Sequence, residues 1–141
     1  MARADIPIID TASTPYWAAA RQGRLLIAEC GACGKVHHYP RPFCPHCWSD
    51  DVRPVQASGT GTLYTYSTVY VNDLPPFSDR LPYVAAIVEL AEGPRVMTTI
   101  ENAEAVALRV GMAVTASFRP VDADDPESPY LTIFTPNEEP T

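Results

Sequence analysis

Cys30-Gly31-Ala32-Cys33-Gly34 and Cys44-Pro45-His46-Cys47 are the two stretches that decide the fold, and they hold all four cysteines of the chain. Each Cys-x-x-Cys turn can present two thiolates to one soft divalent cation, and two such turns complete a tetrahedral shell. This paired spacing is a strong metal signal. The sequence therefore predicts a structural Zn²⁺ site whose ligands are Cys30, Cys33, Cys44 and Cys47.

The residues alone do not exclude other uses of these cysteines. Disulfides would need an oxidising compartment, and the segment Met1 to Pro7 has no apolar stretch that would direct export. A thiol-redox pair is possible for either turn, but two pairs together favour shared ligation. Iron in a rubredoxin-like site would use the same ligands. Because four thiolates close the shell, we expect the metal to be structural and not catalytic.

Residues beside the cysteines are expected to support the metal site. Gly31 and Gly34 can adopt the positive backbone dihedrals that turn amide groups toward the sulfurs. His37, His38 and His46 lie close enough in the sequence to act as replacement ligands. Positions at the surface or next to the ligands are the simpler expectation for these imidazoles.

Length and composition indicate a small globular protein. The chain has 141 residues, of which 46% are hydrophobic. This size accommodates one ordinary domain, or one small domain plus a metal-stapled module that needs little core. No apolar run approaches the roughly 20 residues of a membrane-spanning helix. We therefore expect a cytoplasmic protein with no membrane partner.

The charge argues against a nucleic-acid partner. Ten basic and seventeen acidic residues give a net charge of -7, which opposes polyanion binding at long range. The distribution is uneven, because residues 21–53 are relatively basic whereas residues 54–141 hold four arginines against twelve acids.

Three segments follow from the pattern along the chain: residues 1–23 as a lead-in with a short helix, 24–57 as a zinc ribbon, and 58–141 as a barrel. The helix is predicted from Pro15 to about Gln22, with Thr14 as its cap and Gly23 as its end. Its aromatic residues, Tyr16 and Trp17, need a surface to pack on, either in this chain or on a partner subunit.

The ribbon and the barrel are predicted from strand patterns. Residues 24–29 and 36–39 should form the two ribbon strands that lead to and from the first cysteine turn. Residues 62–71 alternate strictly, which places Leu63, Thr65 and Ser67 on one face and the tyrosines at 64, 66 and 70 on the other. Four further strands are predicted at residues 83–90, 95–101, 112–119 and 130–135, and one helical turn could fit in the connection 102–111.

Five strands with such a connection between the third and the fourth match an OB-type barrel. The predicted fold class is therefore mainly β: a short N-terminal helix, a rubredoxin-like zinc ribbon and a five-stranded OB-fold. In an OB-fold the connections 72–82 and 121–129 would border the binding face. The first contains Phe77 and Arg80, and the second is acidic.

This ordered combination resembles a family of bacterial and archaeal proteins associated with acyl-CoA enzymes, in which an N-terminal helix, a rubredoxin-like zinc ribbon and an OB-fold follow one another. The resemblance covers roughly residues 15–135. The stretches that carry it, besides the two cysteine turns, are Tyr16-Trp17, Gly23-Arg24-Leu25, Tyr39-Pro40-Arg41-Pro42, Ser58-Gly59-Thr60-Gly61-Thr62-Leu63-Tyr64 and Val110-Gly111-Met112-Ala113-Val114.

The resemblance implies a role in an enzyme complex. Such proteins are non-catalytic partners of thiolase-superfamily enzymes, including thiolases, acyltransferases and the lipid-transfer-like aldolases that cleave steroid side-chain CoA esters. Their OB-fold subunit is thought to help bind the CoA portion and to bridge and stabilise a hetero-oligomer. A bound CoA should find arginines for its phosphates, and Arg41, Arg53 and Arg80 are the candidates, with Phe77 as an apolar contact. Solvated surface positions are the alternative for each arginine.

Other functions remain open on the sequence. Zinc ribbons and OB-folds also occur in nucleic-acid-binding modules, although such binding needs a concentrated basic surface. The strand face that carries the tyrosines at 64, 66 and 70 could stack adenine, contact a partner or form part of the barrel core. An independent enzyme is disfavoured because no nucleophile, base and orienting group occur together. Electron transfer by an iron form is the weakest alternative.

Overall fold

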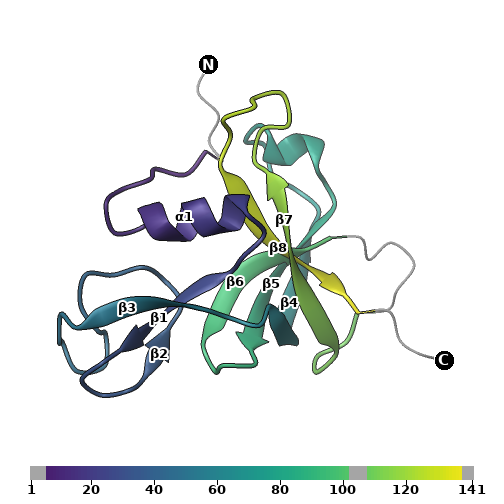
Figure 1. Ribbon diagram of the computed structural model, residues 1–141. Coiled ribbons are helices and arrows are strands. Elements are labelled where there is room, and N and C mark those ends of the chain that lie inside the picture. The colour runs from purple at the N-terminus through teal and green to yellow at the C-terminus, as the bar shows by residue number, and fades with distance from the viewer. Residues whose placement is uncertain (1–5, 102–107, 138–141) are drawn as a thin grey trace.

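The computed structural model describes residues 6–101 and 108–137, which form a helix, a small three-stranded sheet and a closed five-stranded barrel (Figure 1). The elements are α1 (Thr14–Arg21), β1 (Leu26–Cys30), β2 (Val36–His37), β3 (Val52–Gln56), β4 (Thr60–Val69), the 3-10 helix η1 (Phe77–Asp79), β5 (Tyr83–Leu90), β6 (Arg95–Ile100), β7 (Ala113–Pro120) and β8 (Tyr130–Pro136). Within these ranges, neither helix is long and apolar enough to cross a membrane. The predicted helical turn in residues 102–111 falls mostly outside the described residues.

Helix α1 lies where the sequence predicts it but begins differently. Ser13 occupies the capping position without a side-chain cap, and the Thr14 hydroxyl donates to the Asp10 carbonyl oxygen at 2.7 Å. The predicted capping role of Thr14 is therefore wrong, because a turn over residues 10–13 holds this end of the helix. Gly23 ends the helix as predicted, with a φ of +76° that residues with a Cβ rarely adopt.

The ribbon sheet has the strand order β2-β1-β3, so β1 is central. The returning strand is shorter than predicted and covers only Val36–His37. Strand β3 was not predicted, because Pro54 lies inside it and proline usually argues against a strand. It is an edge strand, where a missing amide donor is tolerated.

The barrel has the strand order β4-β5-β6-β8-β7 and closes through pairing of β4 with β7. Strands β6 and β8 pair in parallel, and the other barrel pairs are antiparallel. The predicted five-stranded OB-like barrel is confirmed. Gly61 lies where β4 pairs with both β5 and β7, and a Cβ there would lie 2.6 Å from Val88 Cγ1. A glycine is needed for this close approach.

A β-bulge in β4 changes which side chains enter the barrel. The pairing with β5 shifts between Leu63 and Thr65, so Tyr64 is an extra residue. Leu63 is fully buried and Tyr66 packs against the same core, although strict alternation predicts that they face opposite sides. The predicted common face of the tyrosines at 64, 66 and 70 is therefore wrong beyond the bulge.

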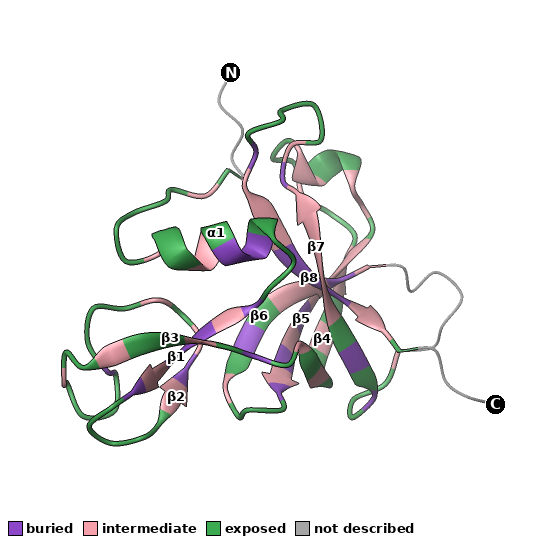
Figure 2. Ribbon diagram, in the orientation of Figure 1, coloured by how far each residue is buried: buried purple, intermediate pink, exposed green. Residues whose placement is uncertain are grey.

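One hydrophobic core runs from the base of the ribbon into the barrel (Figure 2). Leu25 and Ile27 of the ribbon and Ala57 of the linker belong to the same buried cluster as the barrel residues. Its barrel members are Leu63, Ala86, Val88, Leu90, Val96, Ile100, Met112, Val114 and Phe134. Helix α1 covers this junction by contacting both β1 and β8. The ribbon is thus anchored at its base, whereas its cysteine end projects away from the barrel (Figure 1).

Candidate metal centre

The two cysteine turns meet and bring their four sulfur atoms within 4.8 Å of one another. The Sγ atoms of Cys30 and Cys47 are 3.6 Å apart, and those of Cys33 and Cys44 are 3.7 Å apart. A zinc ion with Zn–S bonds of about 2.3 Å would separate tetrahedral sulfurs by about 3.8 Å. A disulfide would need about 2.05 Å, and all four cysteines are free. This donor set fits Zn²⁺, and the four sequence-predicted ligands lie together.

The two turns are near copies of each other in their hydrogen bonds. The amide of Gly34 donates to the Cys30 carbonyl at 2.8 Å, and the amide of Trp48 donates to the Cys44 carbonyl at 2.9 Å. Backbone amides also point at sulfur in both turns, from Ala32 to Cys30 Sγ and from His46 to Cys44 Sγ, each at 3.3 Å. These amides would stabilise thiolate charge in a metal complex.

The glycines of the first turn have different roles. Gly34 has a φ of +77°, as predicted, whereas Gly31 is not in the positive region. A Cβ on Gly31 would lie 2.2 Å from Asp51 Oδ2, so a side chain there would require the exposed Asp51 carboxylate to move. In the second turn, Trp48 occupies the position equivalent to Gly34, with a φ of +68°.

The thiols differ in acidity because their surroundings differ. Amide hydrogen bonds, chiefly from Cys33, lower the pKa of the Cys30 thiol to about 7. Desolvation opposes ionisation of Cys44, but the amides of His46 and Cys47 outweigh it and lower its pKa. Despite a backbone hydrogen bond from Ser49, desolvation and the other cysteines raise the pKa of Cys47 to about 12. The Cys47 thiol therefore stays protonated at neutral pH unless a cation compensates the charge of its thiolate.

The histidines lie outside the sulfur cluster, in which the described residues supply the four cysteines as ligands. His38 packs edge-on against Tyr16, with ring centroids 5.6 Å apart, and against Tyr39 at 4.5 Å. Burial lowers the pKa of His38 to about 4, so its ring is neutral at pH 7. His37 is buried, and His46 is exposed.

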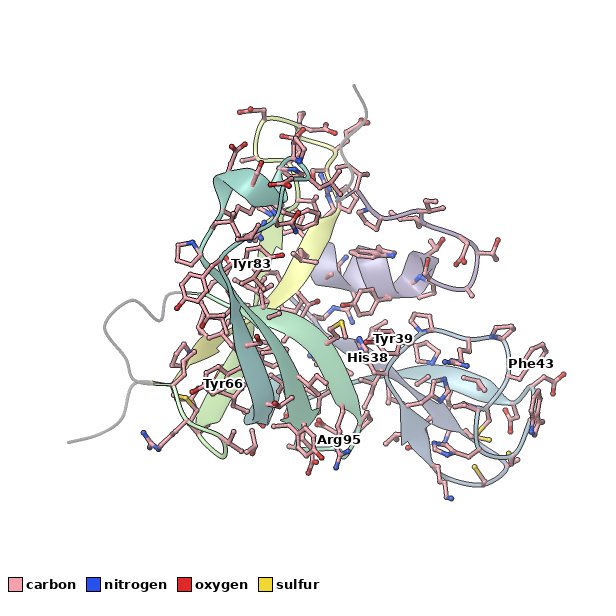
Figure 3. The ribbon with its side chains drawn as sticks, turned by 180° about the vertical axis from the view of Figure 1, so that it is seen from behind. His38, Tyr39, Phe43, Tyr66, Tyr83 and Arg95 are labelled. Atoms are coloured by element: carbon pink, nitrogen blue, oxygen red, sulfur yellow. The ribbon has the colours of Figure 1, made fainter. Side chains whose placement is uncertain are left out.

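Tyr16, His38 and Tyr39 form the joint between helix, ribbon and barrel. Figure 3 shows His38 and Tyr39 between the ribbon and the barrel. The hydroxyls of Tyr16 and Thr132 of β8 form a hydrogen bond of 2.7 Å. The amide of Met97 in β6 donates to the Tyr39 hydroxyl at 3.3 Å. A cavity of about 310 Å³ lies at this joint, with walls from all three parts of the molecule. Tyr16 therefore packs within the chain, which was one of its two predicted surroundings.

The predicted CoA contacts divide into two separate groups. Arg41 and Arg53 line one cavity of about 190 Å³ between α1 and the ribbon, with apolar walls that include Leu26. Arg53 Nη2 lies 2.7 Å from Glu29 Oε1, and this hydrogen bond raises the pKa of Arg53. Arg80 and Phe77 lie in the β4–β5 connection, with Arg80 Cζ 6.0 Å from the Phe77 ring centroid. That connection is at the opposite end of the molecule from the ribbon (Figure 1).

The three tyrosines of β4 and its following loop also separate. Tyr66 lies against the core, and its hydroxyl donates to the Leu108 carbonyl at 2.8 Å. Tyr64 remains outside, beneath the guanidinium of Arg95 at 3.9 Å from the ring centroid. Tyr70 is 72% exposed. Tyr66 thus has the predicted core role, and the other two are surface residues.

Two features of the surface were missed by reasoning from the sequence. Trp48 is 80% exposed at the metal end of the ribbon. Aligning the two cysteine turns in the sequence places Trp48 at the position of Gly34, which could have predicted its positive φ. The contact between Tyr39 and β6 had no signal, because it depends on how the ribbon docks against the barrel.

Comparisons with known proteins agree with this architecture. The family descriptions "ChsH2, rubredoxin-like zinc ribbon domain" and "ChsH2, C-terminal OB-fold domain" match residues 17–53 and 54–119. A probable enoyl-CoA hydratase alpha subunit of Thermomonospora curvata is 38% identical over 92% of this chain, which spans only 39% of that protein's length. A DUF35 domain-containing scaffold protein of Methanocaldococcus jannaschii is 37% identical over 81% of this chain and 82% of its own length.

A solved structure matches nearly the whole architecture. A chain of the Ltp2-ChsH2(DUF35) aldolase superimposes with a TM-score of 0.78 and is 36% identical. The match covers 92% of this chain and 98% of that chain. The similarity therefore includes the ribbon, the barrel and their relative arrangement.

Proposed function

The chain belongs to the DUF35 family, which joins a ChsH2-type rubredoxin-like zinc ribbon to an OB-fold, and we propose that it is a non-catalytic subunit of an acyl-CoA enzyme complex. Its partner is an enzyme of the thiolase superfamily: a thiolase, an acyltransferase or an aldolase that cleaves steroid side-chain CoA esters. In this role the chain assembles the complex and contributes to binding of the CoA portion, while the reacting groups belong to the partner.

One observation carries this proposal: the match over 98% of a chain from an aldolase made with a ChsH2(DUF35) component. The names of the other relatives point the same way, because one is a hydratase subunit and another is a scaffold. The metal centre supports a structural role, since its four thiolates fill a tetrahedral shell and leave no position for substrate. The net charge of -7 disfavours the alternative of a nucleic-acid-binding module.

For the CoA portion, we propose the cavity lined by Arg41 and Arg53. Two guanidinium groups beside an apolar wall offer what a phosphate and an adjoining adenosine require. Arg53 would have to share or exchange its hydrogen bond with Glu29. Arg80 and Phe77 remain an alternative contact at the far end of the barrel, where they could meet only a different part of an extended ligand or partner.

The test begins with purification of the tagged chain from its native host at native abundance, with the accompanying proteins identified by mass spectrometry. The expected result is a stoichiometric thiolase-like subunit, whose turnover of an acyl-CoA ester falls when this chain is omitted from the purified mixture. Elution of the chain alone, or turnover of acyl-CoA by the chain alone, would contradict the proposal. Salt-dependent binding of single-stranded DNA at micromolar protein would favour the nucleic-acid alternative.

A further inference from the structure

Trp48 has a backbone conformation that its own side chain disfavours. Its φ of +68° makes it the single non-glycine residue with a positive φ among the residues that the structure describes. The equivalent position in the first cysteine turn is Gly34, with a φ of +77° and the same amide-to-carbonyl hydrogen bond. A side chain that begins with a Cβ is sterically disfavoured in this left-handed region, and a bulky one is a true outlier. Glycine would satisfy the turn better.

The side chain of Trp48 is largely exposed to solvent. It is 80% exposed, and its indole makes no aromatic or cation–π contact within residues 6–101 and 108–137. A strained backbone that presents a large aromatic group to solvent does not help this chain to fold. Such an outlier indicates a function outside the chain, and a tryptophan is the side chain most enriched at the centres of protein interfaces.

Other exposed apolar residues lie close to Trp48 in the sequence, on and just before the second cysteine turn. We define the second-turn patch as the four exposed residues Pro42, Phe43, Pro45 and Trp48. Phe43 is 52% exposed and lies at the outer end of the ribbon, away from the barrel (Figure 3). The first turn offers no such surface, because its corresponding residues are Gly31, Ala32 and Gly34. The apolar surface is therefore specific to one of two otherwise matching turns.

The charge around the second-turn patch defines the chemistry of what covers it. Asp50 and Asp51 follow Trp48 and are exposed, and the Asp51 carboxylate lies against the first turn at Gly31. Two exposed cations, Lys35 and Arg41, oppose these carboxylates, and Arg41 directly precedes the patch residue Pro42. The two carboxylates and the two cations balance, so four thiolates around a dication, with about two net negative charges, would leave this end negative. A complementary surface is apolar with a basic rim, which excludes a polyanion.

We infer that the second-turn patch docks onto the enzyme subunit, with Trp48 inserted into an apolar pocket that is rimmed by lysine or arginine side chains. The inference rests on the proposed function, because the enzyme subunit is the partner that function requires. To the proposed function, this inference adds which surface of the chain docks, which residue anchors it and what chemistry the partner's pocket has.

The test is the substitution Trp48→Gly, which relieves the backbone and removes the anchor. We expect a protein that binds zinc as before and unfolds thermally at or above the wild-type midpoint, yet binds the separately purified enzyme subunit at least about tenfold more weakly by calorimetry. Trp48→Asn, which also tolerates a positive φ, should show the same loss, and Trp48→Phe should recover most of the affinity. Binding should also weaken as salt is raised, because the basic rim is screened.

Tyr70→Ala is the matched control, because Tyr70 is comparably exposed at 72% but lies in the loop at the other end of the barrel. This control should bind the subunit as the wild type does. If the wild-type chain acquires no enzyme subunit, the proposed function fails. If the wild type binds and Trp48→Gly binds equally well, only the docking surface is refuted. Loss of folding in Trp48→Gly would also overturn the inference, and so would wild-type chains that associate with one another through Trp48 while Trp48→Gly binds the enzyme subunit normally.

Discussion

At the scale of single residues, His38 links the acidity of the solution to the stability of the joint. Burial lowers its pKa to about 4, whereas an unfolded histidine titrates near 6.5. The unfolded state therefore binds more protons between these pH values, so the contribution of His38 is complete above about pH 6.5 and is lost as the pH falls toward 4. The full effect is on the order of 3 kcal/mol. Burial also lowers the pKa of His37, which acts in the same direction.

The substitution His38→Phe should flatten this pH dependence. A phenyl ring can keep the edge-on contacts with Tyr16 and Tyr39, and it removes a buried Nδ1 that has no hydrogen-bond partner among the residues that the structure describes. We expect the free energy of unfolding, measured by urea denaturation from pH 7 to pH 4, to decline less steeply than in the wild type. His46→Gln, at an exposed histidine, should retain the wild-type slope once zinc content is matched. Equal slopes for His38→Phe and wild type would show that the ring is not desolvated.

The sequence predicts the metal ligands, but it does not predict the conformation of every residue around them. Cysteine spacing specifies the four thiols because the turn geometry is local, and the positive φ of Gly34 follows from the same local geometry. Gly31 does not have the predicted positive φ, and the Asp51 carboxylate that occupies the place of a Cβ comes from a residue twenty positions later. The positive φ of Trp48 contradicts residue preference, so preference alone could not predict it.

At the scale of elements, Arg21 ties α1 to the acidic connection between β7 and β8. Its guanidinium donates from Nη1 to the Ser128 carbonyl at 2.7 Å and from Nη2 to the Pro126 carbonyl. Its Cζ also lies 5.6 Å from the ring centroid of Tyr130. The sequence placed residues 121–129 beside a binding face, and the structure attaches this acidic connection to the helix.

Arg21→Ala should lower the free energy of unfolding by about 1 kcal/mol, because a charged group loses hydrogen bonds in a partly exposed setting. Hydrogen exchange of residues 121–129 should accelerate as well. Arg21→Lys keeps the charge but not the two-pronged geometry, so it should restore only part of the protection. Arg24→Ala is the control, since the side chain of Arg24 bonds to that of Gln22 on the surface. Equal exchange in Arg21→Ala and Arg24→Ala would refute the tether.

Element boundaries show how far local pattern determines this fold. The barrel strands were predictable because alternation and turn residues act over short range. The bulge at Tyr64 was not, because it is a property of the pairing between β4 and β5. Likewise, β3 is stabilised by its pairing with β1, in which Ala28 lies opposite Pro54. The sequence of β3 alone therefore does not predict the strand. Long-range pairing thus explains both departures.

At the scale of the whole molecule, the ribbon is held by two different forces. Its base shares the core of the barrel through Leu25 and Ile27. Between residues 29 and 51, in contrast, the buried residues are Cys30, His37 and Cys44. Because so few groups are buried over these twenty or so residues, we expect a bound metal to supply much of the folding free energy at this end. If residues 24–57 were an independent domain, as the sequence predicts, the whole ribbon would unfold together and not its outer part alone.

Removal of zinc should therefore unfold the outer part of the ribbon and leave the rest in place. With a chelator and a reductant at pH 7, we expect amides of residues 30–51 to exchange much faster, while residues 25–28 and the barrel strands keep their protection in mass-spectrometric hydrogen exchange. Cys44→Ser should reproduce this pattern without a chelator, and added Zn²⁺ should reverse it only in the wild type. The same treatment should abolish binding of the enzyme subunit, because Trp48 lies in the unfolded part. Protection that persists over residues 30–51 would show that the thiol cluster needs no metal, and loss of protection throughout the barrel would show that the metal stabilises the whole chain.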